Sequence, residues 1–258
     1  MKLQSIRALA RCVILESLRR KDLWVVAILG FVIILASGAL GFFGFDGLQI
    51  FAKDLGISVL GMLATIIAIL TASRLLPEEI RNRTLYPLLS RPITRFELLL
   101  GKLAGAVAVS WISFVILSVL TGVALLIFKV QFEWIMLQYL VLKMLGLVVI
   151  CSMTIAFSAY LTPAAAATMS FIFAFGSPMI IRGLTMGFDP SNPISKTLFP
   201  IINGVLPQVQ LFDLSGRAVY PNFGLVPIGV VGFLVLYAVA YSSTMLGLGW
   251  LKFRKAAV

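Results

Sequence analysis

The sequence predicts an all-α integral membrane protein with six transmembrane helices. Of its 258 residues, 60% are hydrophobic and only 12% are charged, whereas soluble domains carry roughly 45–50% apolar and about 25% charged residues. The mean hydropathy is +1.06. We expect a single transmembrane domain over residues 1–258. A helix needs about 20 apolar residues to cross a bilayer, and runs near this length cover roughly Trp24–Phe45, Leu55–Leu75, Leu103–Phe128, Val141–Tyr160, Ala164–Ile181 and Leu225–Trp250.

Composition argues against several functional classes. The chain has no histidine and only two cysteines, Cys12 and Cys151, so the usual ligand sets of zinc and haem sites cannot be assembled. A net charge of +11 would suggest nucleic-acid binding in a soluble protein, but in a membrane protein a basic excess records topology. We therefore expect the lipid bilayer as a partner, no nucleic acid and no metal site.

The distribution of Lys and Arg predicts the orientation in the membrane. With the N-terminus inside the cell, fifteen of the 21 basic residues fall in cytoplasmic segments and six elsewhere. Cytoplasmic loops of membrane proteins carry such an excess. We therefore expect a multi-pass protein of the cell's inner (cytoplasmic) membrane, with both termini in the cytoplasm.

Residues 1–23 are predicted to form a separate element ahead of the first span. On a helical wheel of residues 3–18, apolar side chains share one half and polar side chains the other, with Arg7 inside the apolar arc. A basic amphipathic helix of this kind lies in the membrane interface. The alternative is a plain anchor that only enforces the positive-inside rule.

The fourth and fifth spans are separated by only Leu161, Thr162 and Pro163. Proline removes a backbone donor and clashes with the preceding turn of a helix. We therefore predict a tight turn here in place of one very long helix.

No group suited to catalysis or ion coupling is expected within the spans. No Asp, Glu or His sits mid-span, whereas proton-coupled carriers generally need a titratable group in the path. A Ser-His pair cannot be built, and no Gly-x-x-x-x-Gly-Lys-Ser/Thr loop is present. We expect no catalytic residue and no cofactor in this chain. Lys143 and Arg182, near the ends of the fourth and fifth spans, either bind an anionic head group or extend to the interface.

The most informative segment is the predicted cytoplasmic loop 77–102, which reads PEEIRNRTLYPLLSRPITRFELLLGK. Proline is tolerated at the first position of a helix, and acidic residues are favourable in the first turn. Pro77, Glu78 and Glu79 therefore predict a helix start, and the helix is expected to end near Ser90.

A second helix is predicted after this one. Pro92 disfavours helical geometry in the residue before it, so a new helix is expected to start near Thr94 and to continue through Glu97 into the third span. The result is a helical hairpin that projects into the cytoplasm. The alternative is a solvated, charged loop that only enforces topology.

The loop resembles the signature loop of permease subunits of the type 2 ABC exporter family. The resemblance rests on the acidic pair, on Arg-Thr-Leu, on Leu-Leu-Ser-Arg-Pro-Ile and on the later Arg, Glu and Gly-Lys. The residue before Thr84, often glycine in the family, is Arg83 here. The motif positions are occupied by Glu78, Glu79, Arg83, Thr84, Leu88, Leu89, Arg91, Pro92, Arg95, Gly101 and Lys102.

The resemblance implies a function and a set of partners. In this family the loop forms a coupling helix that docks into a separate ATPase subunit, and the N-terminal amphipathic helix is the elbow helix. The chain is then expected to be the transmembrane subunit of an ABC exporter, paired with a second permease chain as a homodimer or heterodimer. ATP and magnesium are expected in the partner ATPase. The alternative is a non-transport membrane scaffold that anchors a cytoplasmic or extracytoplasmic partner.

The segment 182–224, between the fifth and sixth spans, contains five prolines and an apolar strip. We expect short helices lying at the outer membrane surface. Similar segments of type 2 exporters cap the outer end of the pathway, and the alternative is docking of an extracytoplasmic partner.

A weak polar stripe is predicted on the third span, where four hydroxyl side chains fall on one side of the helix. They either face a pathway or bond across to neighbouring helices. Gly101 and Gly105 are spaced for close helix packing. The stripe consists of Ser110, Ser113, Ser118 and Thr121.

Overall fold

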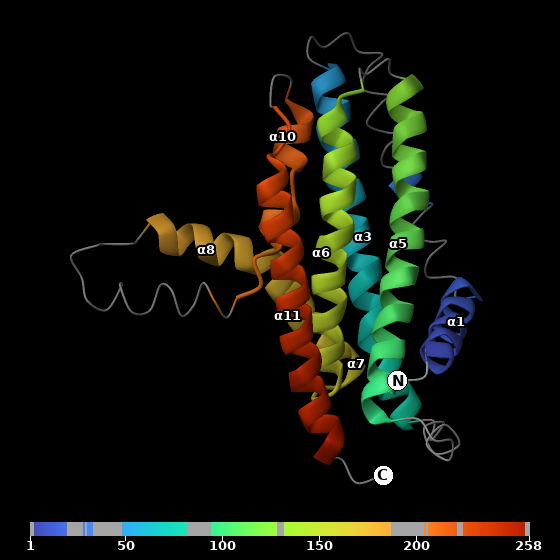
Figure 1. The fold of residues 1–258 in the computed structure, drawn as a ribbon. Coiled ribbons are helices and arrows are strands. Elements are labelled where there is room, and N and C mark those ends of the chain that lie inside the picture. Colours follow the sequence, from blue (N-terminus) through green and yellow to red (C-terminus); the bar gives the residue numbers. More distant parts are fainter. Residues whose placement is uncertain are drawn as a thin grey trace, which may run out of the picture.

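The computed structural model is a bundle of long helices (Figure 1). It describes residues 3–19, 28, 30–32, 48–81, 94–127, 132–186, 204, 206–220 and 224–255, and no strand occurs within them. The expected all-α class is confirmed. In chain order the elements are α1 (Leu3–Arg19), α3 (Leu48–Arg81), α5 (Arg95–Ile127), α6 (Trp134–Ser158), α7 (Pro163–Phe171), the π-helix η2 (Ile172–Gly176), α8 (Ser177–Met186), the 3₁₀-helix η3 (Val209–Phe212), α10 (Ser215–Val219) and α11 (Ile228–Lys255).

Five helices in the described ranges are long and apolar enough to cross a membrane, and they correspond to the second to sixth predicted spans. Of the first predicted span, Trp24–Phe45, the structure describes residues 28 and 30–32, which are helical, and the rest lies outside the described residues. The five are Lys53–Pro77, Phe96–Ile127, Trp134–Ser158, Pro163–Met186 and Ile228–Lys252.

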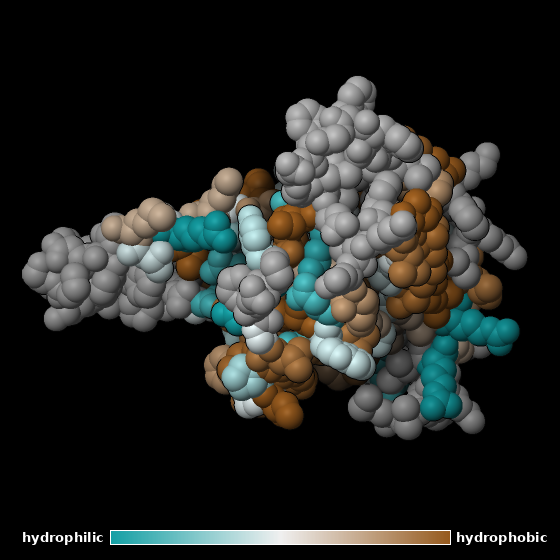
Figure 2. Space-filling model, turned by 90° about the horizontal axis from the view of Figure 1, so that it is seen from above, coloured by the Kyte–Doolittle hydropathy of each residue, from teal (hydrophilic) through white to brown (hydrophobic). Residues whose placement is uncertain are grey.

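The long helices alternate in direction, so the bundle has two distinct ends (Figure 1). We call the lower end the one where α3, α6 and α11 end and α5 begins, and the upper end the opposite one. α3 packs against both α5 and α6, and α11 packs against α6. Large side chains such as Phe114 and Tyr139 fill the core at 1% exposure. Apolar side chains also cover the outer sides, as lipid-facing surfaces require, and hydrophilic patches lie between them in the view from above (Figure 2).

α5 begins where the sequence predicted a helix start. The backbone N–H of Glu97 donates to Thr94 Oγ1, and the backbone N–H of Thr94 donates to Glu97 Oε2, both at 3.2 Å. This reciprocal pair is a capping box, which satisfies two donors that a helix start would otherwise leave free. The residues fix the point at which the chain leaves the predicted loop and enters the bundle.

The predicted helix start at Pro77 is wrong, because Pro77 lies inside α3 and the helix continues to Arg81. Its ring removes the hydrogen bond to the carbonyl of Ser73 and also crowds that carbonyl. Leu75 and Leu76, just before it, are 8% and 0% exposed, so burial of this turn offsets the lost bond. The predicted helix end near Ser90 lies outside the described residues.

The predicted turn between the fourth and fifth spans is confirmed. Residues 159–162 form it, and Pro163 is the first residue of α7, where its missing N–H costs nothing. The span that follows is helical throughout but not straight. It passes through the π-helical segment η2, and α8 then projects sideways from the bundle (Figure 1).

The described part of the predicted outer-surface segment packs into the bundle. Its two short helices, η3 and α10, contact α6, and α10 also contacts α3. Phe212, Ala218 and Val219 are at most 1% exposed. Burial of these side chains fastens the described part of the segment to the spans.

α1 is a helix, as predicted, and it packs along the lower half of α5 (Figure 1). Val13 and Ser17 are buried, whereas Arg7 and Arg11 are exposed. A Cβ atom on Gly105 of α5 would lie 2.6 Å from Val13 Cβ, so the two helices approach closely only because this residue is glycine. The predicted packing role of Gly105 is confirmed.

Replacing Gly105 is therefore expected to loosen α1. A Gly105→Ala substitution should destabilise the protein by about 1–3 kcal/mol through overpacking and should speed trypsin cleavage within α1. Gly122→Ala, on the same helix but with no atom within 4 Å of the added Cβ, is the control. Thermal unfolding and limited proteolysis in detergent measure both effects, and equal behaviour of the two variants would contradict this account of the contact.

Candidate functional site

The predicted docking loop is described only at its two flanks. Glu78 and Glu79 lie in the last turn of α3, and Arg95 is the first residue of α5. Both flanks lie at the lower end of the bundle, near the end of α11 (Figure 1). The remaining predicted docking residues lie outside the described residues, namely Arg83, Thr84, Leu88, Leu89, Arg91 and Pro92.

The predicted polar stripe on α5 does not form one continuous polar surface. The hydroxyls of Ser110 and Ser113 are buried and donate to the carbonyls of Ala106 and Val109, each at 2.8 Å. Ser110 also lies 3.4 Å from the thiol of Cys151 on α6. These two residues therefore sit in a helix contact.

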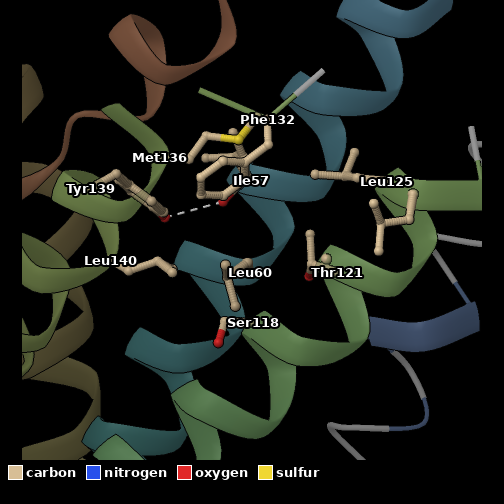
Figure 3. A pocket seen from close by; sticks show the side chains of 11 residues that line it. Ile57, Leu60, Ser118, Thr121, Leu125, Phe132, Met136, Tyr139 and Leu140 are labelled. Atoms are coloured by element: carbon tan, nitrogen blue, oxygen red, sulfur yellow. Dashed lines mark hydrogen bonds between the residues drawn. The ribbon is translucent and has the colours of Figure 1, made fainter. Parts of the chain in front are cut away.

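Ser118 and Thr121 lie elsewhere, in an apolar pocket between α3, α5 and α6 near the upper end (Figure 3). Their hydroxyls also bond to carbonyls of α5, at 2.8 and 2.9 Å. The pocket measures about 270 Å³. Figure 3 shows Tyr139 reaching across it, and its hydroxyl donates to the Ile57 carbonyl of α3 at 3.2 Å. The other described residues that line the pocket are apolar apart from Ser118 and Thr121.

Two ion pairs between residues that the structure describes fasten the spans to neighbouring segments. Lys53 of α3 lies 2.8 Å from Glu133, just before α6, and fastens the upper ends of the two helices. Lys143 of α6 lies 2.9 Å from Asp213, which follows η3. Lys143 is 6% exposed and comes nine residues after the start of α6, roughly 13 Å along the helix axis. A charge at this depth is costly unless it is paired, and it marks a functional site by default.

The Lys143–Asp213 pair is an arrangement that sequence reasoning missed. Asp213 was assigned to a loop, yet its segment packs on α6 and places the carboxylate beside the span. Burial opposes ionisation of Asp213, but the ammonium of Lys143 and the hydrogen bonds from Ser215 outweigh it and lower the pKa of this carboxyl. In the sequence, the only indication of this site was Lys143, a single charged residue within an apolar run.

The ion pair lines a second pocket, of about 490 Å³, which we call the basic pocket. Thr65, at the middle of the span of α3, forms one wall, and the segment after η3 forms another. Arg182 of α8 and Arg217 of α10 line it as well. The pocket thus gathers three cations and one carboxylate from four elements. The sequence places Lys143 and Arg182 near the ends of two different spans, and in the structure both line this pocket.

No cluster of three or more His, Cys, Asp or Glu side chains that could hold a metal ion is found in the part of the chain that the structure describes. The polar groups of the basic pocket are instead suited to binding an anion, because Arg and Lys side chains only donate.

No curated protein matches the chain. The family described as "ABC-2 family transporter protein" matches residues 14–256. The match begins within α1, at residue 14, and includes all five described spans and the stretch between α3 and α5 that resembles a coupling loop. The chain belongs to the ABC-2 family of transporter proteins, and it is a membrane subunit of an ABC transporter.

Proposed function

We propose that the chain is the permease of an ATP-driven exporter, which forms the translocation pathway as a dimer and docks a separate ATPase through residues 77–102. The family match supports a transport subunit that associates with ABC ATPases. The observation that carries the docking assignment is the capping box of Thr94 and Glu97. It ties the loop directly to a helix that runs through the whole bundle, so a displacement of the loop by the ATPase would move α5 as a rigid element.

The first residues of the predicted loop, 77–81, belong to α3. α3 continues past the predicted membrane boundary to Arg81, so Glu78 and Glu79 extend from a span rather than from a flexible link. A docked ATPase would therefore act on two adjacent spans at once. ATP and magnesium would bind in that partner.

The lower end of the bundle is proposed to face the cytoplasm. It carries both flanks of the loop and the end of α11, and the excess of Lys and Arg belongs to the same segments. The upper end, with α10, would face outward. By this proposal the protein lies in the inner membrane with both termini in the cytoplasm.

Cysteine labelling on intact cells tests this orientation. In a background with Cys12 and Cys151 replaced, Tyr220→Cys is expected to react with an impermeant thiol reagent, because Tyr220 is 55% exposed at the upper end. Ser90→Cys is expected to react only after the cells are opened. Labelling of Ser90→Cys from outside would reverse the orientation.

Charge reversal tests the docking assignment. Arg83→Glu together with Arg91→Glu should weaken ATPase binding by about 2–5 kcal/mol, because each change leaves an unmatched charge in the interface. The ATPase should then be lost from detergent extracts while membrane insertion is retained. Lys129→Glu with Lys196→Glu makes the same charge change on the predicted outer side and should leave the complex intact. Unchanged co-purification of the Arg83 and Arg91 variant would refute docking through this loop.

The energy source and the stoichiometry can be tested without knowing the substrate. In liposomes that contain the permease and its ATPase, the labelling rate of Ser118→Cys, which lines the apolar pocket, should change when Mg·ATP is added. An uncoupler should leave that change intact. Native mass spectrometry of the complex should show two permease and two ATPase chains. A response to the uncoupler alone would indicate an ion-coupled carrier, no response would indicate a scaffold, and a single permease chain would rule out the dimer.

A further inference from the structure

We propose that the basic pocket binds the anionic head group of a membrane amphiphile. The proposal goes beyond ATP-driven transport and does not depend on it. It rests on an excess of positive charge in a pocket that reaches Thr65 and Lys143 within the spans and whose walls are fixed and partly apolar.

The charge excess remains after the buried ion pair is formed. Asp213 is the only carboxylate among the described residues that line the pocket, and it is engaged by Lys143 at 2.9 Å. Arg182 and Arg217 make no ion pair with any residue that the structure describes. No carboxylate in the described part of the chain therefore compensates the two guanidinium groups that line the pocket. Guanidinium forks match the oxygens of phosphate and carboxylate, often in a bidentate manner.

The walls of the pocket are held in place by hydrogen bonds that do not involve its charges. Ser177 Oγ, at the start of α8 and 0% exposed, donates to the Pro207 carbonyl at 2.9 Å. The backbone N–H of Gln208 donates to the Tyr237 hydroxyl of α11 at 3.0 Å. The elements that carry Arg182 and Asp213 are thus fastened to each other and to the bundle. A site whose groups are already in position binds without a large ordering cost.

Depth and lining favour an amphiphile over a free ion. Thr65 and Lys143 place the pocket well inside the spans, and Ala174, Phe175 and Pro178 add an apolar wall. A volume of about 490 Å³ lies in the range of roughly 300–1,000 Å³ that holds small-molecule ligands. The apolar wall can contact the chain of a lipid that already lies in the hydrocarbon layer, whereas a free anion gains nothing from apolar contact.

Lipid binding to the full-length chain tests the proposal. The protein is purified in detergent without nucleotide or ATPase and titrated with dioleoyl-phosphatidylglycerol or with dioleoyl-phosphatidylcholine, and native mass spectrometry measures the bound lipid. The anionic lipid should bind about tenfold more tightly, as expected for charge-assisted hydrogen bonds to guanidinium. Arg182→Gln with Arg217→Gln should abolish this preference. Both side chains are exposed, so the variant should fold.

A control variant and a competition experiment distinguish a lipid site from a site for a soluble anion. Arg7→Gln with Arg11→Gln removes the same charge from exposed positions on α1 and should keep the preference. Inorganic phosphate at millimolar concentration should not displace the lipid. Equal binding of the two lipids by the unaltered protein, or equal loss in both double variants, would overturn the site. Phosphate binding that needs Arg182 and Arg217 without a lipid preference would overturn the amphiphile in favour of a soluble anion. Neither result bears on ATPase docking.

Discussion

The polar groups of this protein must find partners inside the protein, because the hydrocarbon layer offers no water to bond them. Hydroxyls on the spans meet this constraint locally by donating to carbonyls three or four residues earlier, as Thr65 does to Gly61. Longer polar side chains meet it by bonding to the backbone of another helix or of the segment before α11. Trp111 donates to the Met144 carbonyl at 2.9 Å, and the amide of Gln138 exchanges two bonds with Val226.

These bonds place the helices relative to one another, since burial of apolar area between helices gives little advantage in lipid. The contact of α3 with α6 shows how closely they fit. A Cβ on Gly61 would lie 2.7 Å from the Tyr139 hydroxyl and 3.2 Å from Lys143 Nζ. Glycine at this position leaves room for the tyrosine to bond Ile57 and for the lysine to reach Asp213. One small residue thus permits two of the polar contacts that define the upper half of the bundle.

The proposed docking loop and the basic pocket lie apart but share a helix. α3 carries Thr65 in the pocket wall and ends at Arg81 beside the loop, a separation of about 24 Å along the helix axis. Pro77 lies between them and removes one hydrogen bond from the helix, which gives α3 a point where it can bend. By this arrangement, ATPase docking and head-group binding would act on the same helix, on either side of Pro77.

The sequence by itself determined the class of the protein, the spans that the structure describes, the helix start at Thr94, the turn at Pro163 and the family. These depend on local composition, on capping chemistry and on contiguous motif residues, all of which can be read from neighbours in the chain. Three features were decided only by the tertiary structure. Pro77 stays helical because burial of the turn before it outweighs the lost hydrogen bond. α8 leaves the bundle through a π-helical segment that no feature of the sequence predicted. The sequence places Asp213 in a loop, but the structure pairs it with Lys143 because its segment packs on α6. The two residues are 70 positions apart in the chain. A local sequence pattern cannot predict a contact over that separation.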